Sequence, residues 1–199
     1  MQNASSLSSR ALIAASGLMV AATAVAGPTF SLTRVSRIAS PNGAEISAVD
    51  TGTRQLFSTG SFGLSVFNLG AGGSLSDAGF IDLSGVIPAG VNSISSVAVD
   101  PLGRGFGVAG VIPDDNTGTR GKLVAFDLNT RAILATFDVG FNPDHVTFTA
   151  DGSRILIADE GESSGSADPV GGVTVVNLAG VTGVGNVNTA VANTYDFQN

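Results

Sequence analysis

A pattern that returns about every 50 residues constrains this chain more than any other feature. Each copy holds an apolar run, an acidic turn that ends in arginine, and a later apolar run that closes on Asn or Asp followed by Leu. The turn acids, spaced 50 and 51 residues apart, are Asp50, Asp100 and Asp151. A repeat of this length is typical of arrays in which every copy is one supersecondary unit.

Each copy divides into four short strands. In the second copy we expect strands at 94–99, 105–109, 123–128 and 133–139. These runs are rich in β-branched and aromatic residues and are bounded by Gly, Pro, Asn and Asp, as strands are. No window after Ala26 has a convincing helical period. A β-sandwich also has short strands, but it would not repeat one turn chemistry at this spacing. The sequence therefore predicts an all-β fold of β-propeller blades, each with four antiparallel strands.

About three blades are present, at approximately 43–83, 91–139 and 142–197. A propeller ring needs at least about four blades, and the third copy runs out at its fourth strand. We therefore expect residues 27–199 to be an incomplete repeat region, the N-terminal part of a larger propeller. A trimmed gene and completion by another copy of the chain are the alternatives.

The first 26 residues have the organisation of an export signal. Arg10 precedes an apolar run from Ala11 to Ala26, which closes on the A-x-A pattern Ala24-Val25-Ala26. The run is shorter than the roughly 20 residues that span a bilayer, and no other run of that length follows. The sequence predicts a signal peptide at 1–26, cleavage near Gly27, and a secreted or cell-surface protein with no transmembrane segment in the mature chain.

Composition excludes several classes of function. Asp and Glu outnumber Lys and Arg by 16 to 9, which argues against nucleic acid and anionic membranes as partners. The chain has no Cys and one His, so disulfide scaffolds, thiolate sites and clusters of several histidines are excluded. The absence of N-x-[ST] sequons beyond residue 26 favours a bacterial source.

Several motifs make the chain resemble the choice-of-anchor I family. They are an Ala-Glu-Ile start at Ala44-Glu45-Ile46, the pair Pro143-Asp144, the turn Thr149-Ala150-Asp151-Gly152, and the loop Asp159-Glu160-Gly161-Glu162. The family's loop begins with Asn and ends with Pro, so this chain departs from it at Asp159 and Ser163. The resemblance covers about residues 32–199. It implies a secreted, mostly bacterial propeller with YVTN-like repeats, largely without a proven activity.

Two groups of side chains are candidate sites. Glu45, Asn92, Asp144 and His145 lie at the starts of the first strands of the copies, which converge on the central channel of a propeller, where ligands often bind. An equal alternative is that Glu45 and Asp144 cap turns and that His145 packs at a strand edge.

The second group is the acidic loop. Asp159, Glu160 and Glu162 supply oxygen ligands of the kind that Ca²⁺ prefers. Without a metal, these three residues form a solvated acidic turn between strands, and ordinary loops of this kind are common.

These observations favour a binding or interaction scaffold over an enzyme. The expected partner is an extracellular protein, a glycan or an ion. The alternative is a metal-dependent hydrolase, similar to a phosphoesterase, with its acidic site at the channel mouth. Phosphate chemistry needs positive groups or metal ions, and none of the motifs gathers the few basic residues, so no reaction is predicted.

Overall fold

The computed structural model describes residues 31–88, 90–114, 118–163 and 167–197. The predicted signal peptide at 1–26 lies outside these residues. The chain divides into two units, 1–33 and 34–199, and the account below concerns the second unit.

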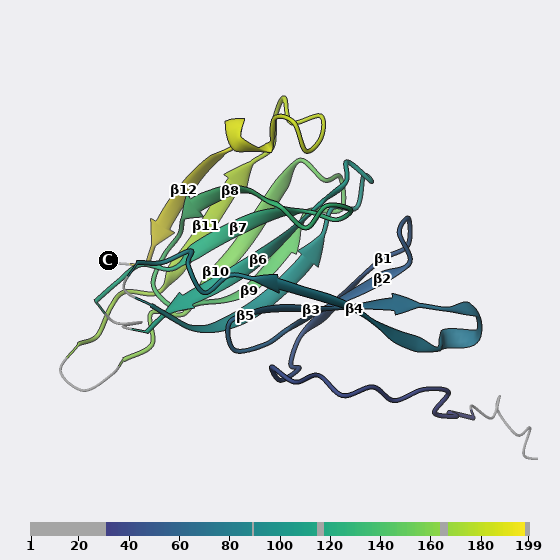
Figure 1. Ribbon diagram of the computed structural model, residues 1–199. Coiled ribbons are helices and arrows are strands. Elements are labelled where there is room, and N and C mark those ends of the chain that lie inside the picture. The colour runs from purple at the N-terminus through teal and green to yellow at the C-terminus, as the bar shows by residue number, and fades with distance from the viewer. Residues whose placement is uncertain (1–30, 89, 115–117, 164–166, 198–199) are drawn as a thin grey trace, which may run out of the picture. The chain divides into compact units, whose positions relative to one another are not determined.

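Twelve strands form three four-stranded antiparallel sheets, each built from consecutive strands (Figure 1). The first sheet holds β1 (Ser47–Asp50), β2 (Gln55–Thr59), β3 (Gly63–Leu69) and β4 (Leu75–Asp82). The second holds β5 (Val91–Val99), β6 (Phe106–Pro113), β7 (Lys122–Asp127) and β8 (Ile133–Asp138). The third holds β9 (Pro143–Phe148), β10 (Arg154–Asp159), β11 (Gly172–Asn177) and β12 (Val191–Asp196). Two single-turn 3₁₀ helices, Ala71–Gly73 and Val187–Thr189, are the helical elements of the described residues.

The predicted fold class is confirmed. Three consecutive four-stranded sheets, packed through their first strands β1, β5 and β9, are three propeller blades. Two strands are longer than the sequence indicated: β5 begins at Val91 rather than at Ile94, and β6 ends at Pro113 rather than at Ala109. The pairing of β5 with β6 is irregular at two places, between Val91 and Ser93 and between Ile94 and Ser96. At these irregularities the ladder continues through residues whose side chains do not alternate regularly between the two faces of the sheet.

The acidic turns of the repeat form as their chemistry requires. The Asp50 carboxylate accepts hydrogen bonds from the backbone N–H groups of Gly52 and Thr53 at 3.2 and 2.7 Å. The Asp151 carboxylate likewise accepts one from Ser153 N at 3.0 Å. Aspartate stabilises a tight turn in this way because its short side chain reaches the backbone two or three residues on.

The core lies between the sheets, in two apolar layers. Phe57 of the first sheet meets Phe126 of the second with ring centroids 5.4 Å apart, within a fully buried cluster. Phe106 and Phe148 make the corresponding contact between the second and third sheets at 6.0 Å. Alternation explains the layers, since neighbouring residues of each strand in the second sheet face opposite ways, one toward the first sheet and the next toward the third.

Hydrogen bonds also join β5 to the sheets on either side of it. Ser95 Oγ donates to the carbonyl of Pro143 at 2.5 Å, and Ser96 Oγ accepts from Val146 N at 3.0 Å. Ile94 N donates to Gly60 O at 3.3 Å. These polar contacts tie β5 to the third sheet and to the first.

Residues 34–43 run along the outer face of the first sheet and cover part of it. Ser40 Oγ lies 3.0 Å from Ser65 Oγ, Ser36 Oγ accepts from Leu75 N at 3.1 Å, and the Asn42 carbonyl accepts from Ser61 N at 2.9 Å. Ser65 therefore keeps only 4% of its surface exposed, although it faces away from the second sheet.

Candidate functional site

The first strands of the three sheets bring side chains from all three copies to one end of the blades. Glu45 lies two residues before β1, Asn92 is the second residue of β5, and Asp144 is the second residue of β9. Because β10 runs antiparallel to β9, its last residues reach the same end as the start of β9. Glu160, which directly follows β10, is thereby carried to the same place.

These side chains line a single cavity of about 280 Å³, which we call the mouth pocket. Its lining residues are Glu45, Asn92, Ser93, Ser95, Ile112, Asn142, Asp144, Glu160 and Glu162. A second cavity of about 370 Å³, against the first sheet, shares Glu45 and Ser93 with it. The polar region therefore continues from the third sheet to the first.

Asn142 organises the acidic side of the mouth pocket. It is 4% exposed, and its Nδ2 donates to Glu160 Oε2 at 3.1 Å and to Glu162 Oε2 at 3.2 Å. Its own backbone has a φ of +50°, a conformation that Asn adopts more readily than most residues. The Asn142 carbonyl also accepts from Glu160 N at 3.0 Å, so the loop is held by both backbone and side chain.

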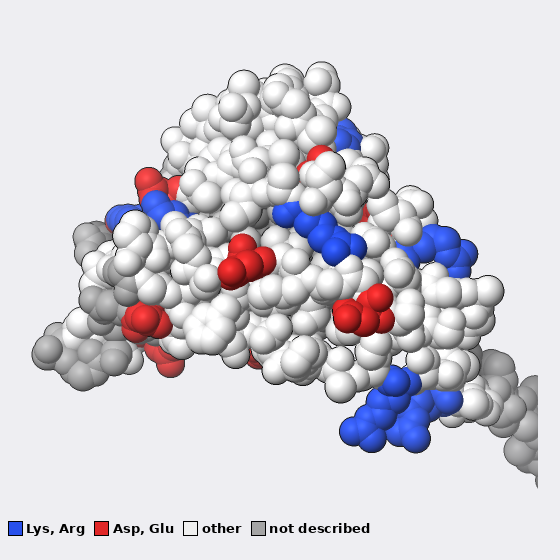
Figure 2. Space-filling view, viewed as in Figure 1, with Lys and Arg blue, Asp and Glu red and all other residues white. Residues whose placement is uncertain are grey.

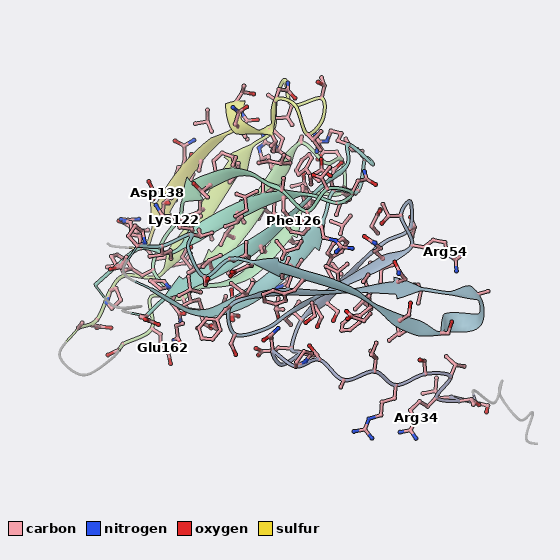
Figure 3. All side chains as sticks on the ribbon, in the orientation of Figure 1. Arg34, Arg54, Lys122, Phe126, Asp138 and Glu162 are labelled. Carbon is pink, nitrogen blue, oxygen red and sulfur yellow. The ribbon has the colours of Figure 1, made fainter. Side chains whose placement is uncertain are left out.

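Gly161 allows the loop to turn between the two glutamates. Its φ is +63°, and a Cβ at this position would lie 2.3 Å from Gly171 N and 2.5 Å from Pro169 O. Both the backbone conformation and the close approach therefore require glycine. Figure 3 shows Glu162 on the loop beyond the end of β10.

The pocket is strongly electronegative. Four carboxylates, those of Glu45, Asp144, Glu160 and Glu162, lie among its lining residues, which include no Lys, Arg or His. Desolvation of the carboxylate raises the pKa of Glu160, and the nearby Asp144 and Glu162 carboxylates raise it further. A positive charge bound here would relieve this repulsion and favour the ionised form of Glu160.

Figure 2 shows one face of the molecule, on which Lys, Arg, Asp and Glu lie in small groups with wide uncharged areas between them. Over the described residues, no group of three or more His, Asp and Glu side chains is arranged closely enough to hold a metal ion directly. The four carboxylates of the mouth pocket favour positive charge over negative charge at this place.

Five of the seven residues singled out in the sequence line the mouth pocket, and two do not. His145 is exposed and pairs with Ala158, and it is not among the lining residues. Asp159 is 2% exposed and lines a separate cavity of about 150 Å³. The structure therefore joins Glu160 and Glu162 to the channel-mouth residues rather than to Asp159.

The Asp159 carboxylate has a bonding role between strands. Its Oδ1 accepts from Gly140 N at 2.9 Å, and its Oδ2 accepts from Thr174 Oγ1 at 2.6 Å. Burial raises the pKa of Asp159, while these two hydrogen bonds and the Arg120 charge act in the opposite direction. Asp159 thus links the segment between β8 and β9 to β11.

Sequence reasoning did not single out Asn142, although it bridges two of the pocket's carboxylates. A signal was present, because Asn142 precedes the first strand of the third copy much as Asn92 opens that of the second. Ser93 and Ser95 were likewise not singled out, since a serine within a strand gives no indication of which cavity it faces.

Comparison with solved structures shows the same fold at low sequence identity. The luciferin-regenerating enzyme matches with a TM-score of 0.55 and 14% identity, over 70% of this chain and 46% of that one. Hydrazine synthase of Kuenenia stuttgartiensis matches with a TM-score of 0.50 and 14% identity, over 77% of this chain and 37% of that one. The chain thus spans less than half the length of either structure.

A search among curated proteins returned no match. The model of the choice-of-anchor I domain matches residues 45–199, which include all twelve strands and every residue of the mouth pocket. The resemblance noted in the motifs is therefore confirmed, and the chain belongs to the choice-of-anchor I family.

Proposed function

We propose that the protein is an extracellular binding scaffold whose mouth pocket takes a positively charged ligand. The observation that carries this proposal is the convergence of Glu45, Asn92, Asp144, Glu160 and Glu162 from three separate sheets on one cavity. Loops on a rigid scaffold are common places for binding residues. Here the scaffold brings together side chains that are up to 117 positions apart in the sequence.

Export is part of the proposal. The signal-like segment at 1–26 and membership in the choice-of-anchor I family both support a secreted or cell-surface location. Within the described residues, no helix is long and apolar enough to cross a membrane.

Binding is favoured over phosphoester hydrolysis by the charge of the site. An enzyme of that kind must hold a phosphate, which requires positive groups beside the metal ions. The lining of the mouth pocket has four carboxylates and no Lys or Arg, so its field repels a phosphate and attracts a cation.

Isothermal titration with two probes, CaCl₂ and a short oligolysine peptide, tests the proposal. The Glu160→Gln/Glu162→Gln double variant removes two charges from the pocket and keeps the shape of both side chains. Near a protein surface, one charge pair at 4 Å is worth up to about 4 kcal/mol, so we expect affinity for at least one probe to fall tenfold or more. Added salt should weaken binding of the wild type.

Asp82→Asn/Asp138→Asn is the matched control. Both carboxylates are exposed and lie outside the mouth pocket, so this variant has the same net charge as the test variant. Equal affinities in the two double variants would attribute any binding to net charge alone. No binding of either probe to the wild type would contradict the proposal.

A further inference from the structure

Asn42 and Gly43 form the one Asn-Gly pair of the sequence. The backbone nitrogen that follows an asparagine can attack the carbonyl carbon of the asparagine side chain. A side chain on the following residue hinders this attack, and glycine has none. Elsewhere in the sequence asparagine precedes Ala, Leu, Ser, Thr, Val or Pro. Asn42 is therefore the asparagine whose side chain is most open to attack by its own backbone.

A β-turn presents this pair. Gly43 N donates to the Ser40 carbonyl at 3.3 Å, which closes the turn Ser40-Pro41-Asn42-Gly43, and proline at the second position presets the backbone of such a turn. This bond is longer than most N–H···O bonds, so the Gly43 nitrogen leaves it at little cost. Gly43 has a φ of +87°, and a Cβ built there would meet no atom within 4 Å. The surroundings of the attacking residue are thus open.

The backbone of Asn42 is held, whereas its side chain is not. The Asn42 carbonyl accepts from Ser61 N at 2.9 Å. Its side-chain amide has no hydrogen-bond partner within the part of the chain that the structure describes. Two cavities, of about 370 and about 350 Å³, both have Asn42 among their lining residues. The amide therefore has room to rotate toward the Gly43 nitrogen, and solvent reaches the residue from both cavities.

We propose that Asn42 is a modification site, which deamidates in the folded protein to aspartate and isoaspartate. The Gly43 nitrogen loses its proton and bonds to Asn42 Cγ, while the Cγ–Nδ2 bond breaks and Nδ2 leaves as ammonia with that proton. Water then opens the resulting succinimide ring at either of its two carbonyls. One water is consumed and one ammonia is released, so solvent water is the only reactant that the site needs.

The reaction changes both the charge and the backbone at this position. Either product carries a carboxylate, which is ionised at neutral pH. This carboxylate joins the lining of the cavity of about 370 Å³, which shares Glu45 and Ser93 with the mouth pocket. Isoaspartate also lengthens the backbone by one carbon where residues 34–43 lead into the first sheet. The polar region that joins the two cavities thus becomes more negative as the protein ages.

Peptide mapping of the purified chain by mass spectrometry measures the reaction. Tryptic cleavage at Arg37 and Arg54 releases peptide 38–54, whose one asparagine is Asn42. During incubation of the folded chain in mildly alkaline buffer, we expect a growing fraction of this peptide to gain one dalton. Fragment ions should place the gain at residue 42 and identify isoaspartate among the products.

Asn129 is the internal control. It also lies in an exposed turn, but it is followed by Thr130, whose backbone N–H donates to Asp127 Oδ1 at 2.8 Å. Tryptic peptide 123–131 holds Asn129 as its one asparagine, so a single digest reports both sites. We expect Asn42 to react at least tenfold faster than Asn129. Asn42→Gln should abolish the gain, because glutamine closes the corresponding larger ring far more slowly.

The same chain unfolded in urea shows what the Asn-Gly pair does without the turn. Conversion of Asn42 in the unfolded chain but not in the folded one would overturn the proposal, because the turn would then hold the amide away from Gly43. Equal rates at Asn42 and Asn129 in the folded chain would overturn it as well.

The effect on binding rests on the proposed function and has its own test. Asn42→Asp introduces the carboxylate permanently, and Asn129→Asp adds the same charge at a residue that lines neither cavity. In titrations with the oligolysine peptide, we expect Asn42→Asp to bind at least twofold more tightly than Asn129→Asp. Equal affinities would refute the link to binding. A peptide that binds neither variant would contradict the proposed function instead, while the mass gain in peptide 38–54 decides the reaction by itself.

Discussion

Arg104 joins the second blade to the third, and its replacement by methionine should loosen that junction. Its guanidinium forms a salt bridge with Asp100 at 2.6 Å, and it also donates to the carbonyls of Gly152 at 2.8 Å and Val181 at 3.2 Å. It lies 5.3 Å from the centre of the Phe106 ring. The side chain of Asp100 is 0% exposed and that of Arg104 is 12% exposed, so solvent screens this pair little.

The cost follows from what the methionine leaves behind. Removing one partner of a buried ion pair costs about 3–5 kcal/mol, because the other charge stays buried without compensation. The Asp100 carboxylate keeps the hydrogen bond from the backbone N–H of residue 104 at 2.8 Å, and methionine keeps the contact of the side-chain stem. We therefore expect the lower end, about 3 kcal/mol, or about 6–12 °C in Tm for a chain of this size.

Urea unfolding followed by circular dichroism measures the loss, with Arg54→Met as the matched control. Arg54 ends the acidic turn of the first copy as Arg104 ends that of the second, but its guanidinium is exposed, and within the described part of the chain it donates to one acceptor, Leu69 O, at 3.1 Å (Figure 3). Its replacement should cost less than about 1 kcal/mol. Equal losses in the two variants would refute the assignment of Arg104 as the link between blades.

Two carboxylates give further predictions. Asp159→Asn keeps an acceptor for Gly140 N and a polar partner for Thr174, so it should change the free energy of unfolding by less than about 1 kcal/mol. Asp159→Ala removes both contacts and should cost about 1–3 kcal/mol. Similar losses of stability for the two variants in urea unfolding would contradict the bonding role of this residue. Hydrogen bonds from Thr149 and Ser153 lower the pKa of Asp151 from 3.8 to about 2. Since the folded state binds this proton less readily than the unfolded state, the stabilisation is complete above the ordinary pKa and is lost as pH falls toward 2. The difference in urea midpoint between wild type and Asp151→Asn should therefore shrink over that range, and a constant difference would count against this role.

The repeat predicted the fold because its signals are local. Each acidic turn is decided by one carboxylate and two or three backbone N–H groups, as at Asp50. The strands between the turns could be predicted from the alternation of apolar and polar residues and from their composition alone. The start of β5 was placed too late, because irregular pairing around Ser93 is decided by the neighbouring strand and not by the residues themselves.

The candidate site was less predictable, since a shift of one residue reverses the direction of a side chain in a strand. Asp144 and His145 are neighbours, yet only Asp144 lines the mouth pocket. Asp159 and Glu160 are also neighbours, and the end of β10 separates them into different cavities. That Glu160 and Glu162 face Asn142 depends on the positive φ of Gly161 and Asn142, which composition does not reveal.

The serine contacts of β5 have a consequence for the kinetics of the binding that we propose. Ser95, a lining residue of the mouth pocket, donates to Pro143 at the start of β9, and Ser96 holds Val146 two residues beyond Asp144. The parts of the cavity wall that lie on β5 and β9 are thus fixed to each other without a ligand. A preorganised cavity spends little binding energy on ordering loops, so association should follow a single step limited by diffusion and charge, without a slow rearrangement.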